Sequence, residues 1–359
     1  MNRSAPMTDA ASSLQQYLDD ARRRHGVIGA SLAVLRSGVV ETAASGLLNL
    51  DTGVEVRAES PFQIGSIGKL FTATLAMQLV DEQRLDLDAP IRRYLPDFTI
   101  SDAMVASQLT MRHLLCHNSG MEGDFFPQDD STGPSADSYV RKMALLPQLH
   151  ALGAHMSYCN SGFVLAGRVV EVIAGKPWPH LVMEKICAPL RMRHAFADPR
   201  ESLRYRCAIG HVPNPDEASR LVISPMSYLP LSTAAAGAVL SMTASDLLLF
   251  VAAHLHGGMS ETGVRILSED SARLMRQPVL EVSPHNRGRF NRMGIGWLLI
   301  ESERQILAGH DGACAGQFAY MLSAQDRGFA FALLTNSPSA GLADELRMNR
   351  PGNSGGCLV

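Results

Sequence analysis

Ser66 and Lys69 are the first two residues whose types and spacing could do chemistry. They are the first and last residues of Ser66-Ile67-Gly68-Lys69, and residues three apart on a helix have adjacent side chains. At a helix start, free N–H groups and the helix dipole favour negative charge, and a partly desolvated Lys has a lowered pKa. Such a Lys could take the hydroxyl proton and make the serine a nucleophile. Taken alone, the pair is better explained by a helix-capping serine and a solvated lysine.

The second motif is Tyr158-Cys159-Asn160, which precedes an apolar helical pattern over 163–173. A phenol beside a Lys ammonium can ionise and carry a proton, and an Asn amide can hold the Lys or the substrate. In isolation, a loop tyrosine followed by an Asn or Ser that caps the next helix is the favoured interpretation. Its value therefore depends on the motifs that accompany it.

The third motif, His310-Asp311-Gly312-Ala313, lies at the end of a strand predicted over 305–309. Backbone N–H groups at a strand edge could bind an acyl oxygen, and Gly312 permits close approach. By itself the motif also fits a turn between two strands. The three motifs follow in the order nucleophile, proton shuttle and strand edge, which is far more specific than any one of them.

In this combination the sequence resembles the class C β-lactamase-related serine hydrolases. That family also includes DD-peptidases, D-aminopeptidases, esterases and acyltransferases, and Tyr-x-Asn in the second motif marks its class C branch. The resemblance extends from about residue 10 to about residue 337. Further family-like segments occupy residues 85–91, 94–96, 111–121, 189–192 and 236–247.

The resemblance implies a nucleophile, a proton-transfer pair, groups that orient Lys69 or the substrate, and an oxyanion hole. It assigns these roles to Ser66, to Lys69 with Tyr158, to Asn160 with His310 and Gly312, and to the backbone N–H groups of Ser66 and Ala313. It implies neither a cofactor nor a metal ion. The partner it implies is a small-molecule ester or amide, with an amine or alcohol as a further acceptor.

The sequence departs from the family at His310, where β-lactamases and DD-peptidases have the Lys of Lys-Thr-Gly. Histidine is mostly neutral at pH 7, so a substrate with a free carboxylate is disfavoured and β-lactam hydrolysis is expected to be poor. Histidine here is more similar to the esterase, acyltransferase and aminopeptidase branches. The final helix, predicted over 341–348, is also shorter than the family's usual closing helix.

Metal binding, a cysteine nucleophile and a binding module are the alternatives to a serine enzyme. A metal pair could be formed by His113 and His117, four residues apart, together with Cys116. The sequence has no Glu in an H-E-x-x-H pattern there and no evident third ligand, so packing roles are favoured. Cys159 or Cys314 could be a nucleophile, although a small buried apolar role is favoured for both. A non-catalytic acyl- or penicillin-binding sensor is the main alternative to an enzyme.

The elements that must position the motifs give an α+β fold: an antiparallel sheet flanked by helices, with an inserted all-helical domain. Helical patterns cover 10–25 and 66–82, and strand patterns cover 28–35, 39–44, 294–300, 305–309, 317–323 and 328–335. We predict a discontinuous sheet domain over 1–80 and 220–348, a helical domain over 81–219 and a disordered tail over 349–359. The site is expected in the groove between the domains.

Composition limits the function classes. The net charge is −3, so no nucleic-acid partner is expected. Neither a secretory leader nor a long apolar run is evident, which predicts no membrane partner and a cytoplasmic location, and the six cysteines are expected as free thiols.

The sequence leaves the acyl acceptor open. Water would make the chain an esterase or amidase, and a small amine or alcohol would make it a transacylase, for example in natural-product biosynthesis. A D-aminopeptidase-like or DD-peptidase-like hydrolase is the alternative within the same chemistry.

Overall fold

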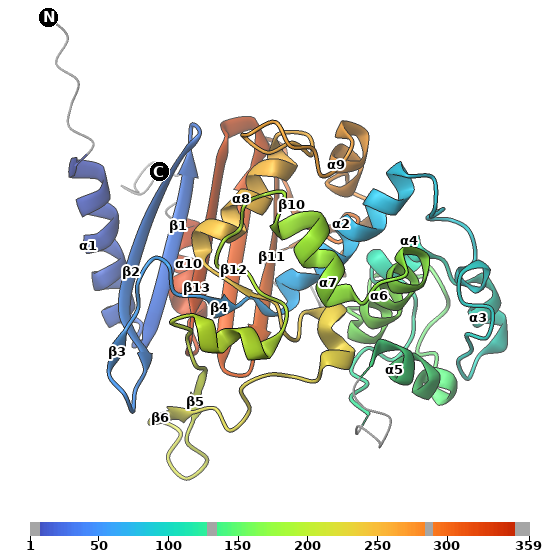
Figure 1. The fold of residues 1–359 in the computed structure, drawn as a ribbon, viewed down its shortest axis with the longest axis horizontal. Coiled ribbons are helices and arrows are strands. Elements are labelled where there is room, and N and C mark those ends of the chain that lie inside the picture. The colour runs from blue at the N-terminus through green and yellow to red at the C-terminus, as the bar shows by residue number, and fades with distance from the viewer. Residues whose placement is uncertain (1–7, 128–134, 284–289, 349–359) are drawn as a thin grey trace, which may run out of the picture.

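The computed structural model describes residues 8–127, 135–283 and 290–348. Within this part, nine strands form one antiparallel sheet in the order β3-β2-β1-β13-β12-β11-β10-β9-β8 (Figure 1). These strands are β1 (Gly29–Arg36), β2 (Val39–Asn49), β3 (Val54–Glu55), β8 (Leu280–Glu281), β9 (Arg292–Met293), β10 (Leu298–Glu301), β11 (Ile306–Cys314), β12 (Gln317–Ala324) and β13 (Phe329–Thr335). Two short pairs lie outside it: β4 (Phe62–Gln63) with β7 (Ser241–Met242), and β5 (His211–Pro213) with β6 (Leu221–Ile223).

The sheet joins the two ends of the chain. β1 pairs on one side with β2 and on the other with β13, with Leu32 opposite Leu333. Both β1 and β13 are buried along almost their whole length, which explains their continuous apolar runs. The predicted sheet built from both termini is confirmed.

Helices cover both faces of the sheet and fill the region beside it (Figure 1). They are α1 (Thr8–Arg24), α2 (Gly68–Asp81), α3 (Ala103–Gln108), α4 (Met111–Leu115), α5 (Ala136–Lys142), α6 (Asn160–Ala174), α7 (Trp178–Val182), α8 (Ala244–Leu255), α9 (Glu269–Met275) and α10 (Ala340–Met348). The α+β fold predicted from the sequence is confirmed.

Two hydrophobic clusters separate the layers. One joins α1 and α10 to one face of the sheet, and it contains Leu14, Leu18 and Leu342. The other joins α2, α6 and α8 to the opposite face. The spacing of Leu14, Leu18 and Ala21 places one apolar stripe of α1 on the sheet, as a surface helix requires.

Helix α2 runs through the centre of the molecule. Its buried positions lie on every side, because it packs against α6 and α7 and shares a hydrophobic cluster with the sheet. A helix apolar all round is stable only in such surroundings. This central position buries Lys69, which lies in its first turn.

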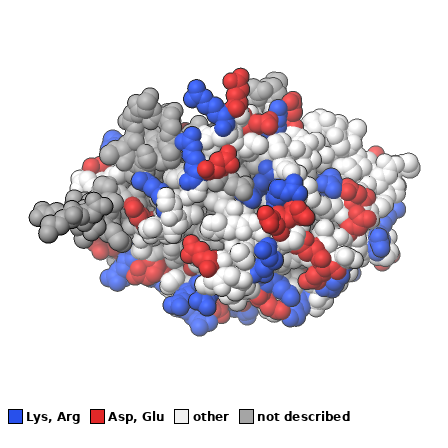
Figure 2. All heavy atoms as spheres, turned by 90° about the horizontal axis from the view of Figure 1, so that it is seen from above, with Lys and Arg blue, Asp and Glu red and all other residues white. Residues whose placement is uncertain are grey.

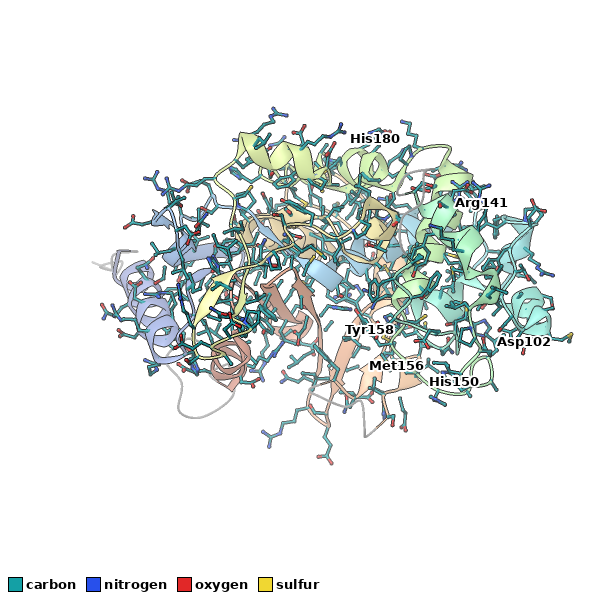
Figure 3. All side chains as sticks on the ribbon, turned by 90° about the horizontal axis from the view of Figure 1, so that it is seen from below. Asp102, Arg141, His150, Met156, Tyr158 and His180 are labelled. Atoms are coloured by element: carbon teal, nitrogen blue, oxygen red, sulfur yellow. The ribbon has the colours of Figure 1, made fainter. Side chains whose placement is uncertain are left out.

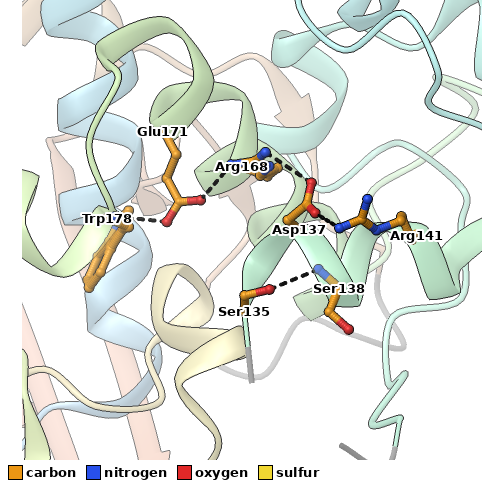
Figure 4. A network of polar contacts seen from close by, with 7 residues as sticks. All are labelled: Ser135, Asp137, Ser138, Arg141, Arg168, Glu171 and Trp178. Carbon is orange, nitrogen blue, oxygen red and sulfur yellow. Dashed lines mark hydrogen bonds and ion pairs between the residues drawn. The ribbon is translucent and has the colours of Figure 1, made fainter. Parts of the chain in front are cut away.

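A polar network fixes α5, α6 and α7 against one another (Figure 4). Arg168 of α6 donates to Asp137 of α5 at 3.0 Å, and Glu171 accepts from the Trp178 backbone N–H at 2.9 Å. The Trp178 indole in turn donates to Thr72 of α2 at 2.9 Å. The network thus holds α6, which begins at Asn160, in place beside α2.

The strand that carries the third motif is longer than predicted. β11 continues from Ile306 to Cys314, and Ala313 pairs with Phe318 of β12. The motif therefore lies inside a strand and is neither beyond its end nor in a turn. Burial does alternate through the motif, with Asp311 and Ala313 the more exposed positions, but its polar and small residues lack the apolar alternation that predicts a strand. The predicted domain limits stay predictions, and 349–359 lies outside the described residues.

Acidic and basic side chains are mixed on the face seen from above (Figure 2). This face carries no broad field of one sign. Among the described residues, no helix is long and apolar enough to cross a membrane.

Candidate active site

Ser66 lies in a single 3₁₀ turn, Gly65–Ile67, directly before α2. Gly65 has a φ of +52°, a left-handed conformation that favours glycine. In the segment 61–70, Ser66 is partly exposed and every other residue is buried. The turn therefore presents one hydroxyl from an otherwise enclosed segment, at a helix start where negative charge is stabilised.

The Lys69 side chain is fully buried beneath Ser66. Its Nζ lies 3.1 Å from Ser66 Oγ and donates to the Ala236 carbonyl oxygen at 2.6 Å. Burial lowers the pKa of Lys69 to about 7, against a smaller opposing effect of nearby Cys159 and Asp124. A neutral amine at hydrogen-bond distance from a serine hydroxyl can act as its base.

Tyr158 lies where the helical region meets the sheet (Figure 3). Lys69 Nζ is 4.9 Å from the centroid of its ring. Although the residue is 37% exposed, burial of its hydroxyl raises the pKa of Tyr158, and a hydrogen bond with Ser66 acts in the opposite direction. In the resting site the phenol is therefore protonated, and at neutral pH Lys69 is divided between its neutral and charged forms. Ionisation of the phenol beside a Lys69 ammonium stays a prediction.

Asn160 does not hold Lys69. Its Nδ2 donates to Asp124 Oδ1 at 3.1 Å, whereas the Lys69 amino group is satisfied by Ser66 and Ala236. The reason is that Asn160 begins α6 and faces the loop that carries Asp124. The predicted contact between Asn160 and Lys69 is therefore corrected, and a role for Asn160 toward substrate stays a prediction.

β11 brings the third motif against the serine turn. The neighbouring strand β10 pairs with 306–309 of β11, and in the described part of the chain this pairing does not continue past Gly309. A Cβ on Gly312 would lie 2.0 Å from the Ile64 carbonyl oxygen and 3.0 Å from the Ser66 nitrogen. Gly312 is therefore required for the strand to approach the nucleophile turn. Its predicted role toward substrate stays a prediction.

The proposed oxyanion donors belong to these two adjoining segments. A Cβ on Gly65 would lie 2.6 Å from the Ala313 nitrogen, which places Ala313 directly beside the serine turn. Two backbone N–H groups held so rigidly are suited to a developing oxyanion. Their assignment to Ser66 and Ala313 stays a prediction.

His310 is 1% exposed and lies near Tyr158, with 6.2 Å between the two ring centroids. Its Nδ1 is 2.6 Å from the Asp311 carbonyl oxygen, so Nδ1 carries the hydrogen and Nε2 is left as an acceptor. Burial first, and nearby Lys69 second, lower the pKa of His310 to about 3. The position thus supplies a neutral acceptor, where a Lys would supply a cation.

Cys159, Cys314 and His113 have structural roles or surroundings that oppose chemistry. Cys159 caps α6 by accepting from the Gly162 N–H at 3.2 Å, and burial raises its pKa. Burial also raises the pKa of Cys314 to about 11, so neither thiol is activated as a nucleophile. His113 caps α4 by hydrogen bonding to Thr110.

Three contributors to the site were missed from the sequence. These are the Ala236 carbonyl oxygen, the Asp124 carboxylate and the ring of His117. The first is a backbone atom, which no residue type reveals. His117 and Ala236 lie in segments that resemble the family, and this was the only signal for them.

We expect acylation by this site to depend on pH through Lys69. Because the base is the neutral amine, the rate should rise as pH increases through about 7. Burial lowers the pKa values of His117 and His310, so neither imidazole gains a proton in this range. Pre-steady-state release of nitrophenol from an ester, followed between about pH 5.5 and 8.5, measures the inflection. A flat profile would contradict the assignment of Lys69 as base.

His310→Ala should change substrate preference more than intrinsic acylation. We expect the acylation rate with a small neutral ester to fall by less than about tenfold, because the imidazole has no hydrogen bond to Ser66 in the part of the chain that the structure describes. The ratio of kcat/KM values for neutral and carboxylate-bearing substrates should shift further. If the loss instead equalled that of Ser66→Ala, His310 would have to be the base.

Comparisons with known proteins agree with this geometry. The family described as Beta-lactamase matches residues 14–350. Penicillin-binding protein 4 of Amycolatopsis lactamdurans is 37% identical over 326 residues, covering 90% of this chain and 84% of that protein. Esterase EstB of Burkholderia gladioli is 32% identical over 198 residues, covering 51% of this chain and 50% of the esterase.

Two solved structures extend the comparison. SurE in complex with D-Leu superposes with a TM-score of 0.78 at 30% identity, covering 96% of this chain and 75% of that one. D-amino acid amidase of Ochrobactrum anthropi, in complex with L-phenylalanine amide, superposes with a TM-score of 0.76 at 27% identity, covering 94% and 96%. With its serine turn, its buried lysine and strand β11 beside them, the chain belongs to the β-lactamase family of serine hydrolases.

Proposed function

We propose that the chain is a serine acyl-transfer enzyme that forms an acyl-Ser66 intermediate on a small ester or amide. The observation that carries this proposal is the buried Lys69 amine, 3.1 Å from Ser66 Oγ and with a pKa lowered to about 7. Buried lysines with lowered pKa values cluster at functional sites, where the neutral amine can act as a base. Ser66 remains partly exposed, so substrate can reach its hydroxyl.

The proton steps follow from the resting charges. Lys69 takes the Ser66 proton as Oγ bonds to the acyl carbon, and the N–H groups of Ser66 and Ala313 receive the oxyanion. As the bond to the leaving group breaks, the Tyr158 hydroxyl gives that group a proton and regains one from Lys69. In the second half, the attacking water, amine or alcohol gives its proton to the Lys69–Tyr158 pair, which returns it to Oγ.

We place hydrolysis first, as an esterase or amidase, because relatives named for these activities share the site's family. Transfer to a small amine or alcohol uses the same acyl-enzyme, and it would serve, for example, natural-product biosynthesis. Separating products after reaction of a p-nitrophenyl ester, with and without a primary amine or alcohol, decides between them. Acid as the sole product at high acceptor concentration would exclude transfer to that acceptor. The cytoplasmic location stays a prediction from the sequence.

The charges at the site favour an acyl group that carries an amino group. Asp124 is an exposed carboxylate held by Asn160, and its charge acts on both Lys69 and Tyr158. A Cβ on the adjacent Gly123 would lie 2.6 Å from the Tyr158 carbonyl oxygen, so the two segments are packed together. With His310 neutral, Asp124 would attract an ammonium group and repel a carboxylate. The amidase complex with L-phenylalanine amide supports this substrate class.

Asp124→Asn tests this preference. We expect kcat/KM for D- or L-alanine p-nitroanilide to fall about tenfold, the value of one charge-assisted hydrogen bond. The value for p-nitrophenyl butyrate should stay within about twofold, since that acyl group is neutral. Asp102→Asn is the matched control, because Asp102 caps α3 far from Tyr158 and Asn caps equally well (Figure 3). Equal losses on both substrates would exclude ammonium recognition by Asp124.

A further inference from the structure

His117 contacts the Tyr158 segment at three points. The His117 carbonyl oxygen accepts from the Ser157 N–H at 2.7 Å, and its Nδ1 accepts from the Cys159 N–H at 2.9 Å. Between these two bonds, the imidazole stacks on the Tyr158 ring with 4.3 Å between centroids and 27° between planes. Tyr158 is thus fixed through the residue before it, the residue after it and its own ring.

The position of His117 is itself tightly determined. The residue has a φ of +55°, directly after the C-cap of α4, and its side chain is completely buried. Phe163 of α6 also packs against the imidazole, at 4.8 Å between ring centroids. A left-handed, buried, non-glycine residue costs free energy, and such residues persist where the surrounding structure and function require them.

The hydrogen-bond pattern also fixes the imidazole's tautomer. Because Nδ1 accepts from a backbone N–H, the ring hydrogen lies on Nε2, a buried atom with no partner among the described residues. Burial, with Lys69 and His310 nearby, holds the pKa of His117 well below its usual value. The ring therefore stays neutral and does not exchange protons with Lys69.

We propose that His117 is a positioning residue that holds the Tyr158 phenol against Ser66, through its stacked ring and its two hydrogen bonds to the flanking peptide groups. The inference rests on the proposed function, since it assigns His117 a role only through Tyr158. A tyrosine side chain released from this clamp could rotate away from the serine. Misplacement of a catalytic group by about 1 Å can cost a hundredfold in rate.

Two substitutions separate the parts of the clamp. His117→Ala removes both the ring and the Nδ1 acceptor. His117→Asn can keep an acceptor near the Cys159 N–H and tolerates a positive φ, but it loses the stacked ring. We expect kcat for p-nitrophenyl butyrate to fall about a hundredfold in the first variant and about tenfold in the second, with KM within about twofold in both. The partial recovery by Asn keeps the test usable if the Ala variant folds poorly.

A double-mutant cycle with Tyr158→Phe decides whether His117 acts through the phenol. Tyr158→Phe alone should lower kcat by about 10²–10⁴. Adding His117→Asn should then change kcat by less than about twofold, because no hydroxyl remains to be positioned. His113→Asn is the matched control on the same segment, and its kcat should equal that of the wild type once folding is verified by circular dichroism.

Losses that multiply in the double variant would overturn the inference, as would wild-type kcat in both His117 variants or an effect confined to KM. Failure of the proposed function gives a different result. In that case the wild type and Ser66→Ala would not differ, and no kcat could be assigned to the site at all.

Discussion

Ser66→Ala is expected to abolish covalent acylation and to lower turnover of a p-nitrophenyl ester by about 10⁶-fold or to below detection. The hydroxyl is the partly exposed group of a buried turn and lies 3.1 Å from the Lys69 amine, so its removal leaves the base without a nucleophile. Removing one oxygen from a partly exposed side chain should leave the fold intact. Intact-protein mass after mixing with the ester measures the adduct, and nitrophenol absorbance measures turnover.

The matched control is Ser107→Ala. The Ser107 hydroxyl is exposed on α3 and donates to the Met104 carbonyl oxygen within that helix. This variant should form the adduct as the wild type does. Turnover by Ser66→Ala above the uncatalysed rate would disprove the mechanism. An acyl adduct on that variant, with the same mass increase as on the wild type, would show that another residue is the nucleophile.

Lys69→Met is expected to lower acylation by about 10²–10⁴, the usual contribution of a general base. The same substitution should stabilise the protein near neutral pH. Burial lowers the pKa of Lys69 from 10.5 to about 7, a shift that corresponds to a free-energy cost of up to about 5 kcal/mol. Met has a similar volume and no charge to desolvate, although the Ala236 carbonyl oxygen loses its donor, so we expect a net gain of about 1–3 kcal/mol.

The sign of the pH dependence follows from which state holds the proton. Between pH 7 and 10.5 the unfolded chain keeps the Lys69 proton and the folded protein has released it, so wild-type stability rises with pH through this window. The free-energy cost of burying Lys69 is complete below pH 7 and vanishes above pH 10.5. The stability gain of Lys69→Met over the wild type should therefore shrink as pH rises through this window. Urea unfolding at several pH values measures both effects.

Lys176→Met provides the control for this second prediction. Lys176 is half-exposed and pairs with Glu184 at the surface, so its replacement should change neither acylation nor the pH dependence of stability. If Lys69→Met acylated Ser66 at the wild-type rate, Lys69 would not be the base. Destabilisation across the whole pH range would mean that Lys69 contributes more by its hydrogen bonds than it costs by burial.

The sequence by itself determined the family, the fold class and the identities of the residues that form the centre of the site. Ser66 with Lys69 is a local relation, because a spacing of three within a helical turn brings side chains together whatever the rest of the chain does. The apolar runs of β1 and β13 likewise predicted these strands, since burial on both faces of a strand gives a continuous apolar pattern.

Only the tertiary structure decided how these residues are charged and held. Asn160 bonds to Asp124 and not to Lys69, and burial raises the pKa of Tyr158 while lowering that of Lys69 to about 7. His117 reaches Tyr158 from a distant segment of the chain. Such contacts depend on how α2, α6 and β11 pack together, and pKa shifts depend on the burial that this packing creates. Neither these contacts nor these pKa shifts have a local sequence pattern, because desolvation and long-range hydrogen bonds arise only when distant segments pack into the same core.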